Sequence, residues 1–166
     1  MAVLTVLPVD HPMLRRKASR IRGVSAGLRT FVDDMFDTMQ AHRGAGLAAT
    51  QLGRPWRVIV ADTGAERFAL INPEIVRASG AAIADEGCLS LPNWYGPVER
   101  ATDVTVKGQG LGGKPIRRRL HDLAARVVLH EIDHLDGVIF TDRLVDPEKL
   151  RFVDPRSPEA QELQAS

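Results

Sequence analysis

One short segment constrains this chain more than any other: residues 129–137 read LHEIDHLDG and end a helix predicted over about 120–135. Residues four apart share one face of a helix, so His130 and His134 can both present an imidazole nitrogen to one metal ion. Glu131 lies beside them and could accept a proton. The segment therefore predicts a helix that binds a metal ion.

The predicted helix is apolar on nearly its whole circumference. One side carries Leu120, Leu123, Val127, His130, Glu131 and His134, and the other carries Val128, Leu129 and Ile132. A helix of this kind belongs in the interior. Two imidazoles and a carboxylate left unsatisfied there would be costly, so coordination of a metal ion explains all three together. Asp133 could orient a neighbouring side chain, but solvation at the helix edge is the favoured interpretation.

The remaining patterns indicate an α+β fold. An amphipathic helix is predicted from Ser25, as its N-cap, to about His42. Between Trp56 and Lys107 the β-branched runs are short and separated by turn residues, which is typical of antiparallel strands in a mixed sheet. The predicted strands are residues 56–60, 68–71, 74–78 and 103–107.

Length and composition set broad limits. The 166 residues fit one domain, 1–166, with a weakly structured tail over about 147–166. The 22 basic and 21 acidic residues leave a net charge of +1, which does not favour nucleic acid or an anionic membrane as a partner. There is no signal sequence or apolar stretch of spanning length, and Cys88 is the only cysteine. We therefore expect a cytoplasmic protein in a reducing compartment.

Cys88 gains importance from the two histidines. A free cysteine is usually a small core residue. Together with His130 and His134 it would instead form a three-ligand set that leaves a fourth position for water, as catalytic sites do. Glu131 could take the proton of that water and pass it to a leaving amine after hydroxide attacks a carbonyl.

Residues 44–51, which read GAGLAATQ, are the third segment of interest. The simpler interpretation is a tight connector whose small side chains allow close backbone packing. The alternative is a wall that the backbone of a ligand approaches, with Gln51 as a polar contact. If this segment meets the Cys88 loop, the Gln51 amide and the Leu89 backbone N–H could donate hydrogen bonds to a developing oxyanion.

Three motifs, in this order and at this spacing, resemble those of the peptide deformylases: GAGLAATQ at 44–51, EGCLS at 86–90 and HEIDHLDG at 130–137. The resemblance extends from the N-terminal arm to about Leu144. It implies an α+β fold in which mostly antiparallel sheets pack around a central buried helix that carries the H-E-x-x-H motif. It also implies hydrolysis of the formyl group from N-formylmethionine of new polypeptides, with release of formate.

The resemblance implies roles for individual residues as well. Metal-bound water would attack the formyl carbonyl, with Glu131 as general base and acid. The implied metal ligands are Cys88, His130 and His134, and the implied oxyanion partners are Gln51 and the Leu89 N–H. The implied substrate-binding residues are Ala45, Gly46, Gly87, Val127 and Tyr95, the last in a region where some members carry an arginine.

The family's usual metal is Fe(II), with Zn, Ni or Co able to occupy the site, and the implied partners are formylmethionyl nascent peptides. A monomer is favoured. The proline-rich tail lacks the long terminal helix that certain bacterial members use at the ribosome, so docking by that route is not expected. An ion pair between Glu86 and Arg100 is predicted, because the motif glutamate of the family often pairs with an arginine shortly after the cysteine, and Arg100 is suitably placed.

Two other interpretations remain. A zinc peptidase that uses the same helix would need a third ligand downstream, but no histidine follows His134 and the downstream glutamates lie in the tail. A catalytically silent binding module would be expected to lose Glu131, Gln51 or a metal ligand, and none is lost.

Overall fold

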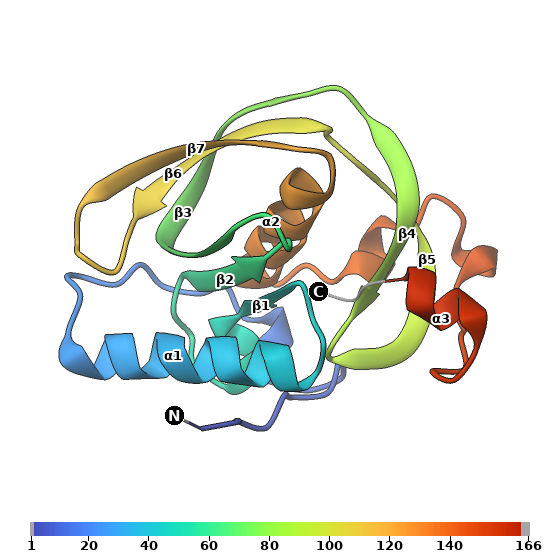
Figure 1. Ribbon diagram of the computed structural model, residues 1–166, viewed down its shortest axis with the longest axis horizontal. Helices are drawn as coiled ribbons and strands as arrows, with labels where there is room; N and C mark the ends of the chain where they lie inside the picture. The colour runs from blue at the N-terminus through green and yellow to red at the C-terminus, as the bar shows by residue number, and fades with distance from the viewer. Residues whose placement is uncertain (1, 164–166) are drawn as a thin grey trace.

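Two antiparallel sheets lie around helix α2 in the computed structural model, which describes residues 2–163 (Figure 1). The first sheet has the strand order β1-β2-β3-β6-β7, with β1 at Gly46–Ala48, β2 at Val58–Asp62, β3 at Arg67–Ser79, β6 at Asp103–Gln109 and β7 at Pro115–His121. The second has the order β4-β5-β8, with β4 at Ala82–Cys88, β5 at Leu91–Arg100 and β8 at Arg151–Phe152. The predicted α+β class with antiparallel strands is confirmed.

Helix α1 (Ala26–Ala41) packs against the first sheet and runs along the lower side of β1 and β2 in Figure 1. It begins after Ser25, whose hydroxyl oxygen accepts a hydrogen bond from the Leu28 N–H over 3.1 Å. Its buried apolar residues recur at helical spacing: Leu28, Phe31, Val32, Met35, Phe36 and Met39. The helix thereby covers the sheet next to residues 44–51.

Helix α2 (Asp122–Leu135) crosses the interior, and its residues 127–135 are all buried. Its predicted start at Leu120 is wrong, because β7 continues to His121 and Asp122 turns the chain into the helix with a φ of 49°. Leu123 is 46% exposed, contrary to its predicted place on the buried face. It lies in the first turn, before the helix enters the core.

Strand β3 joins two of the predicted strands, 68–71 and 74–78. The Asn72-Pro73 dipeptide between them is typical of a turn, but the strand continues through irregular pairing at this point. Asn72 has a φ of 52°, and its side chain exchanges two hydrogen bonds with the backbone of Ile21. A contact with a distant segment therefore stabilises backbone geometry that the local sequence disfavours.

The chain after Asp146 adds to the second sheet. It contains the 3-10 helix η4 (Pro147–Lys149), strand β8, which pairs with β5, and helix α3 (Pro158–Glu162). The sequence predicted only a short possible helix at 158–163, where α3 lies, and it did not predict β8, which depends on pairing with β5 and not on local propensity. The other 3-10 helices are η1 (Pro12–Arg15), η2 (Ala49–Leu52) and η3 (Phe140–Arg143). Among residues 2–163, none of the helices has the length and apolar character needed to span a membrane.

Candidate metal centre

Cys88, His130 and His134 meet in the interior. Each offers one ligand atom, and these atoms all lie within 4.8 Å of one another. The Sγ atom of Cys88 is 3.3 Å from Nε2 of His134. Cys88 ends β4, whereas the two histidines lie one turn apart on α2, so the second sheet and the buried helix together form the cluster.

Glu86 orients the His130 ring. Its Oε1 atom lies 2.8 Å from Nδ1 of His130, and an acceptor in this position keeps the proton on Nδ1. The Nε2 atom of His130 is buried and has no hydrogen-bond partner among the described residues. Its lone pair is therefore free for a metal ion.

His134 is held in its neutral form. Burial lowers its pKa well below the usual value, and the neighbouring charges of His130 and Arg100 lower it further. A neutral imidazole is the form that binds a metal ion. The Nε2 atom beside Cys88 is thus available for coordination.

Glu131 is fully buried next to the cluster, 3.8 Å from Nε2 of His130. Neither of its carboxylate oxygens has a hydrogen-bond partner among the described residues. Burial raises its pKa well above the usual value, and the negative charge of Glu86 adds to this effect. An unpartnered carboxyl and an unpartnered imidazole nitrogen around one thiol fit a cation between them, because groups left this way are otherwise costly.

The environment of the Cys88 thiol also fits a bound cation. Burial, followed by the charge of Glu131, raises its pKa to about 12. A divalent cation reverses this tendency, since a coordinating thiol is deprotonated. The donor set of one sulfur and two nitrogens suits Zn and the transition metals, and does not suit Ca or Mg, which prefer oxygen ligands.

Gln51 brings the third motif to the cluster. Its Nε2 atom donates to Sγ of Cys88 over 3.5 Å and to the Ser90 hydroxyl over 3.1 Å, and its Oε1 accepts from the Ala48 N–H over 3.0 Å. Leu89 directly follows Cys88 and is also buried. The structure therefore brings Gln51, Leu89 and the three metal-binding candidates together in one place.

The family model described as polypeptide deformylase matches residues 3–150. The chain belongs to the peptide deformylase family. A peptide deformylase of Thermomicrobium roseum is 46% identical, over 98% of this chain and 97% of the relative. The solved structure of a peptide deformylase from Legionella pneumophila is 40% identical, with a TM-score of 0.85 and coverage of 89% of each chain. A peptide deformylase from Synechococcus elongatus in complex with actinonin is 37% identical, with a TM-score of 0.86, covering 90% of this chain and 82% of that chain.

Members of this family are metal-dependent hydrolases that remove the formyl group from N-formylmethionine at the start of nascent peptides. The predicted family membership and activity are confirmed. The cluster of Cys88, His130 and His134 is the group in this deformylase that could hold the metal ion.

Two glycines of this deformylase allow close packing beside the cluster. A Cβ atom at Gly46 would lie 2.8 Å from Val127 Cγ1 and 2.9 Å from Glu131 Cγ. A Cβ atom at Gly87 would lie 2.5 Å from Cε1 of Tyr95, its partner on β5. Within this segment, residues 46–48 form β1 and residues 49–52 form η2, and β1 lies directly against α2. The small side chains allow the close packing that the simpler interpretation predicts. Ala45, just before β1, is buried.

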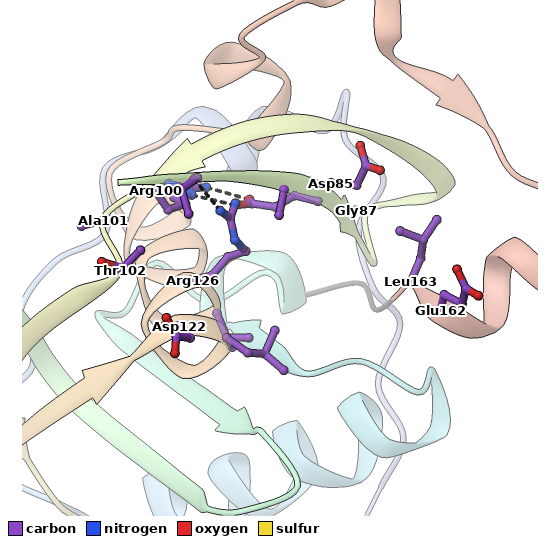
Figure 2. A pocket seen from close by; sticks show the side chains of 14 residues that line it. Asp85, Gly87, Arg100, Ala101, Thr102, Asp122, Arg126, Glu162 and Leu163 are labelled. Atoms are coloured by element: carbon purple, nitrogen blue, oxygen red, sulfur yellow. Dashed lines mark hydrogen bonds and ion pairs between the residues drawn. The ribbon is translucent and has the colours of Figure 1, made fainter. Parts of the chain in front are cut away.

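A cavity of about 360 Å³ opens beside Gly87 and Val127. Its walls come from β4 and from the first turns of α2, and Figure 2 shows Arg100 and Arg126 converging at one side of it. It lies beside Gly87, the residue before Cys88, and beside Val127, one turn of α2 before Glu131.

The ion pair predicted between Glu86 and Arg100 is confirmed, with Arg100 Nε 2.8 Å from Oε2 of Glu86. Burial alone would raise the pKa of Glu86, but the hydrogen bonds from Arg100 and His130 outweigh it and hold the pKa below its usual range. Asp133 was predicted to be solvated, and this prediction is wrong. It pairs with Arg100 and with Arg143, because the β5 and η3 segments cover that edge of the helix.

Proposed function

We propose that Sγ of Cys88 and Nε2 of His130 and His134 hold the single divalent metal ion of this deformylase. The observation that carries the proposal is the convergence of these three buried ligand atoms beside a Glu131 carboxyl that has no hydrogen-bond partner among the described residues. A bound divalent cation would acidify a water molecule and polarise the formyl carbonyl oxygen.

Glu131 acts as the general base and acid in this proposal. Its carboxylate takes a proton from the attacking water and returns it to the nitrogen of the methionine, which leaves as the free amine. The pKa of Glu131, raised by burial, supports this role, since a carboxyl with a raised pKa is a stronger proton acceptor than an ordinary one. The neighbouring charges of Glu86 and Asp133 contribute to that shift.

Gln51 and Leu89 stabilise the oxyanion. The Gln51 amide is held by Ala48 and Ser90, so its Nε2–H group is already oriented at the cluster. The Leu89 backbone N–H follows the ligand Cys88. Donors that are fixed before the reaction stabilise developing charge without reorganisation.

The substrate lies against residues from three segments in this proposal. Ala45 and Gly46 border its backbone on one side. The absence of a side chain at Gly46 lets this segment lie close to Val127 and Glu131 of α2. Gly87 and Tyr95 border it on the β4–β5 side. Val127 lines the cavity that takes the methionine side chain in this proposal.

Fe(II) is the proposed metal in the cell, with Zn, Ni or Co as replacements. Iron with a thiolate ligand is sensitive to oxygen, because both partners can be oxidised. We further propose that the chain, 1–166, works as one catalytic domain and as a monomer in the cytoplasm, acting on formylmethionyl nascent peptides.

The deciding experiment is to purify the protein anaerobically, measure its bound metal, and assay release of formate from a formyl-Met peptide. We expect one equivalent of metal and formate release in the wild type. The Glu131→Gln variant should keep the metal and lose the activity. Metal at one equivalent with no formate released by the wild type would contradict the proposed site, and equal activity in Glu131→Gln would contradict the role of Glu131 alone.

A further inference from the structure

The last described residues of the chain lie beside the active site. Strand β8 pairs Arg151 with Tyr95 and Phe152 with Trp94 of β5. The Arg151 guanidinium reaches Asp85 on β4 over 3.0 Å and Glu159 on α3 over 2.5 Å. These contacts attach α3 and the residue after it, Leu163, to the hairpin that carries Cys88.

Glu162 and Leu163 line the cavity next to Gly87 and Val127. In Figure 2 they approach the hollow from α3, on the side away from Asp122 and Arg126 of α2. The cavity volume of about 360 Å³ falls in the range of roughly 300–1,000 Å³ that is common for small-molecule pockets. Its apolar lining is Ala82, Ala84, Ala101, Leu123, Val127 and Leu163.

The same two residues also border a second cavity, of about 600 Å³. That cavity is lined by His42 and Arg43 at the end of α1 and by Tyr95 on β5. Glu162 and Leu163 therefore separate a hollow beside Val127 from a hollow beside Tyr95. A peptide with its first side chain in the hollow beside Val127 would contact Glu162 and Leu163 where its chain leaves that hollow.

We propose that Leu163 is a specificity-determining residue, forming the outer wall of the pocket that takes the first side chain of the formylated peptide. The inference rests on the proposed assignment of this pocket to the methionine side chain. Leu163 and Val127 both line this cavity, and contact with a second apolar side chain removes more of a long unbranched side chain from water. A short side chain does not reach the wall and gains nothing from it.

The test compares two formylated peptides that are identical except for methionine or alanine at the first position. In Leu163→Ala, kcat/KM for the methionine peptide should fall about fivefold, mainly through KM, because part of the apolar contact is lost. The value for the alanine peptide should change less than about twofold. The ratio of the two values does not depend on how much of a preparation is folded, so poor folding cannot imitate the result.

Two further variants complete the design. Val145→Ala, at a residue that is 48% exposed and outside both cavities, should leave the ratio unchanged. Val127→Ala should lower the ratio. If Val127→Ala lowers it and Leu163→Ala does not, Leu163 is not a wall of the pocket, although the pocket assignment stands. If neither variant changes the ratio, the assignment of the pocket itself is wrong. An equal loss for both peptides in Leu163→Ala would also overturn the proposal.

Discussion

Arg126 donates a hydrogen bond from Nη1 to Oε2 of Glu86 over 2.7 Å, while the other oxygen of the same carboxylate lies 2.8 Å from Nδ1 of His130. Arg126 also donates to the carbonyl oxygens of Val98 and Ala82, each over 2.9 Å. The Arg126 side chain thus connects α2 to both strands of the β4–β5 hairpin, whose first strand ends at Cys88. The position of the third ligand relative to the two histidines depends on this connection.

We expect Arg126→Ala to weaken metal retention without abolishing it. Removing a group that orients a ligand typically lowers metal affinity by about 10- to 100-fold. The effect of Arg126→Ala should lie near the lower end, because Arg100 still holds Glu86 through two hydrogen bonds. Arg100→Ala should be more severe, since it also releases Asp133. Competition with a chelator under anaerobic conditions measures the metal affinity of both variants.

Arg20→Ala is the matched control. Arg20 pairs with Glu74 at the surface, where the two side chains are 65% and 49% exposed, and such pairs contribute little. Metal affinity should therefore equal that of the wild type. Unchanged affinity in Arg126→Ala would show that Arg100 alone fixes Glu86.

The sequence predicts the ligands but not the network behind them. The spacing of His130 and His134 is a local property of one helix, and Ser25 marks the start of α1 through a contact three residues away. Arg126 and Glu86 are 40 residues apart and meet only after the β4–β5 hairpin packs on α2. Nothing in a helical period identifies such a partner.

Asp133 illustrates the same limit. Helix geometry predicts that Asp133 lies at an edge of α2, where a charged side chain is usually solvated. The predicted edge position is correct. The β5 and η3 segments then supply Arg100 and Arg143 to that edge. Similarly, the chain end reaches the cavity only because β8 pairs with β5, so the sequence gives no indication that Leu163 lies near the site.

Glu131→Gln should lower kcat by about 10²- to 10⁴-fold, the usual contribution of a general base. The same change should leave the free energy of unfolding unchanged or higher. The native carboxyl is fully buried with no hydrogen-bond partner among the described residues, and a neutral amide of similar size avoids the cost of burying a charge. Chemical denaturation of the metal-loaded proteins, beside formate-release kinetics, measures both effects. A clear loss of stability would mean that the carboxylate is held by interactions that support the fold.

Gly46→Ala adds only one methyl group, but it should clearly reduce activity. The new methyl group would meet Val127 at 2.8 Å and Glu131 at 2.9 Å, so one of the two side chains must move. Overpacking of this kind typically costs about 1–3 kcal/mol of stability, and displacement of Glu131 adds a loss of kcat. Gly112→Ala is the control, because a Cβ atom there meets nothing within 4 Å. If both variants keep full activity, the contact between β1 and α2 is looser than the structure indicates.

The pH dependence of metal binding tests the state of Cys88. In the metal-free protein, burial and then Glu131 raise the thiol pKa to about 12, so the thiol is protonated near neutral pH and must lose its proton when the metal binds. His134 releases no proton when the metal binds, because its pKa is well below the usual value. Affinity should therefore rise at least about tenfold per pH unit between roughly pH 6 and 8. In Cys88→Asp the same burial acts on a carboxyl whose ordinary pKa is only about 3.9, so less proton release accompanies metal binding and the slope should be shallower, by up to about one unit. Equal slopes in the two proteins would show that the cysteine is already a thiolate before the metal arrives.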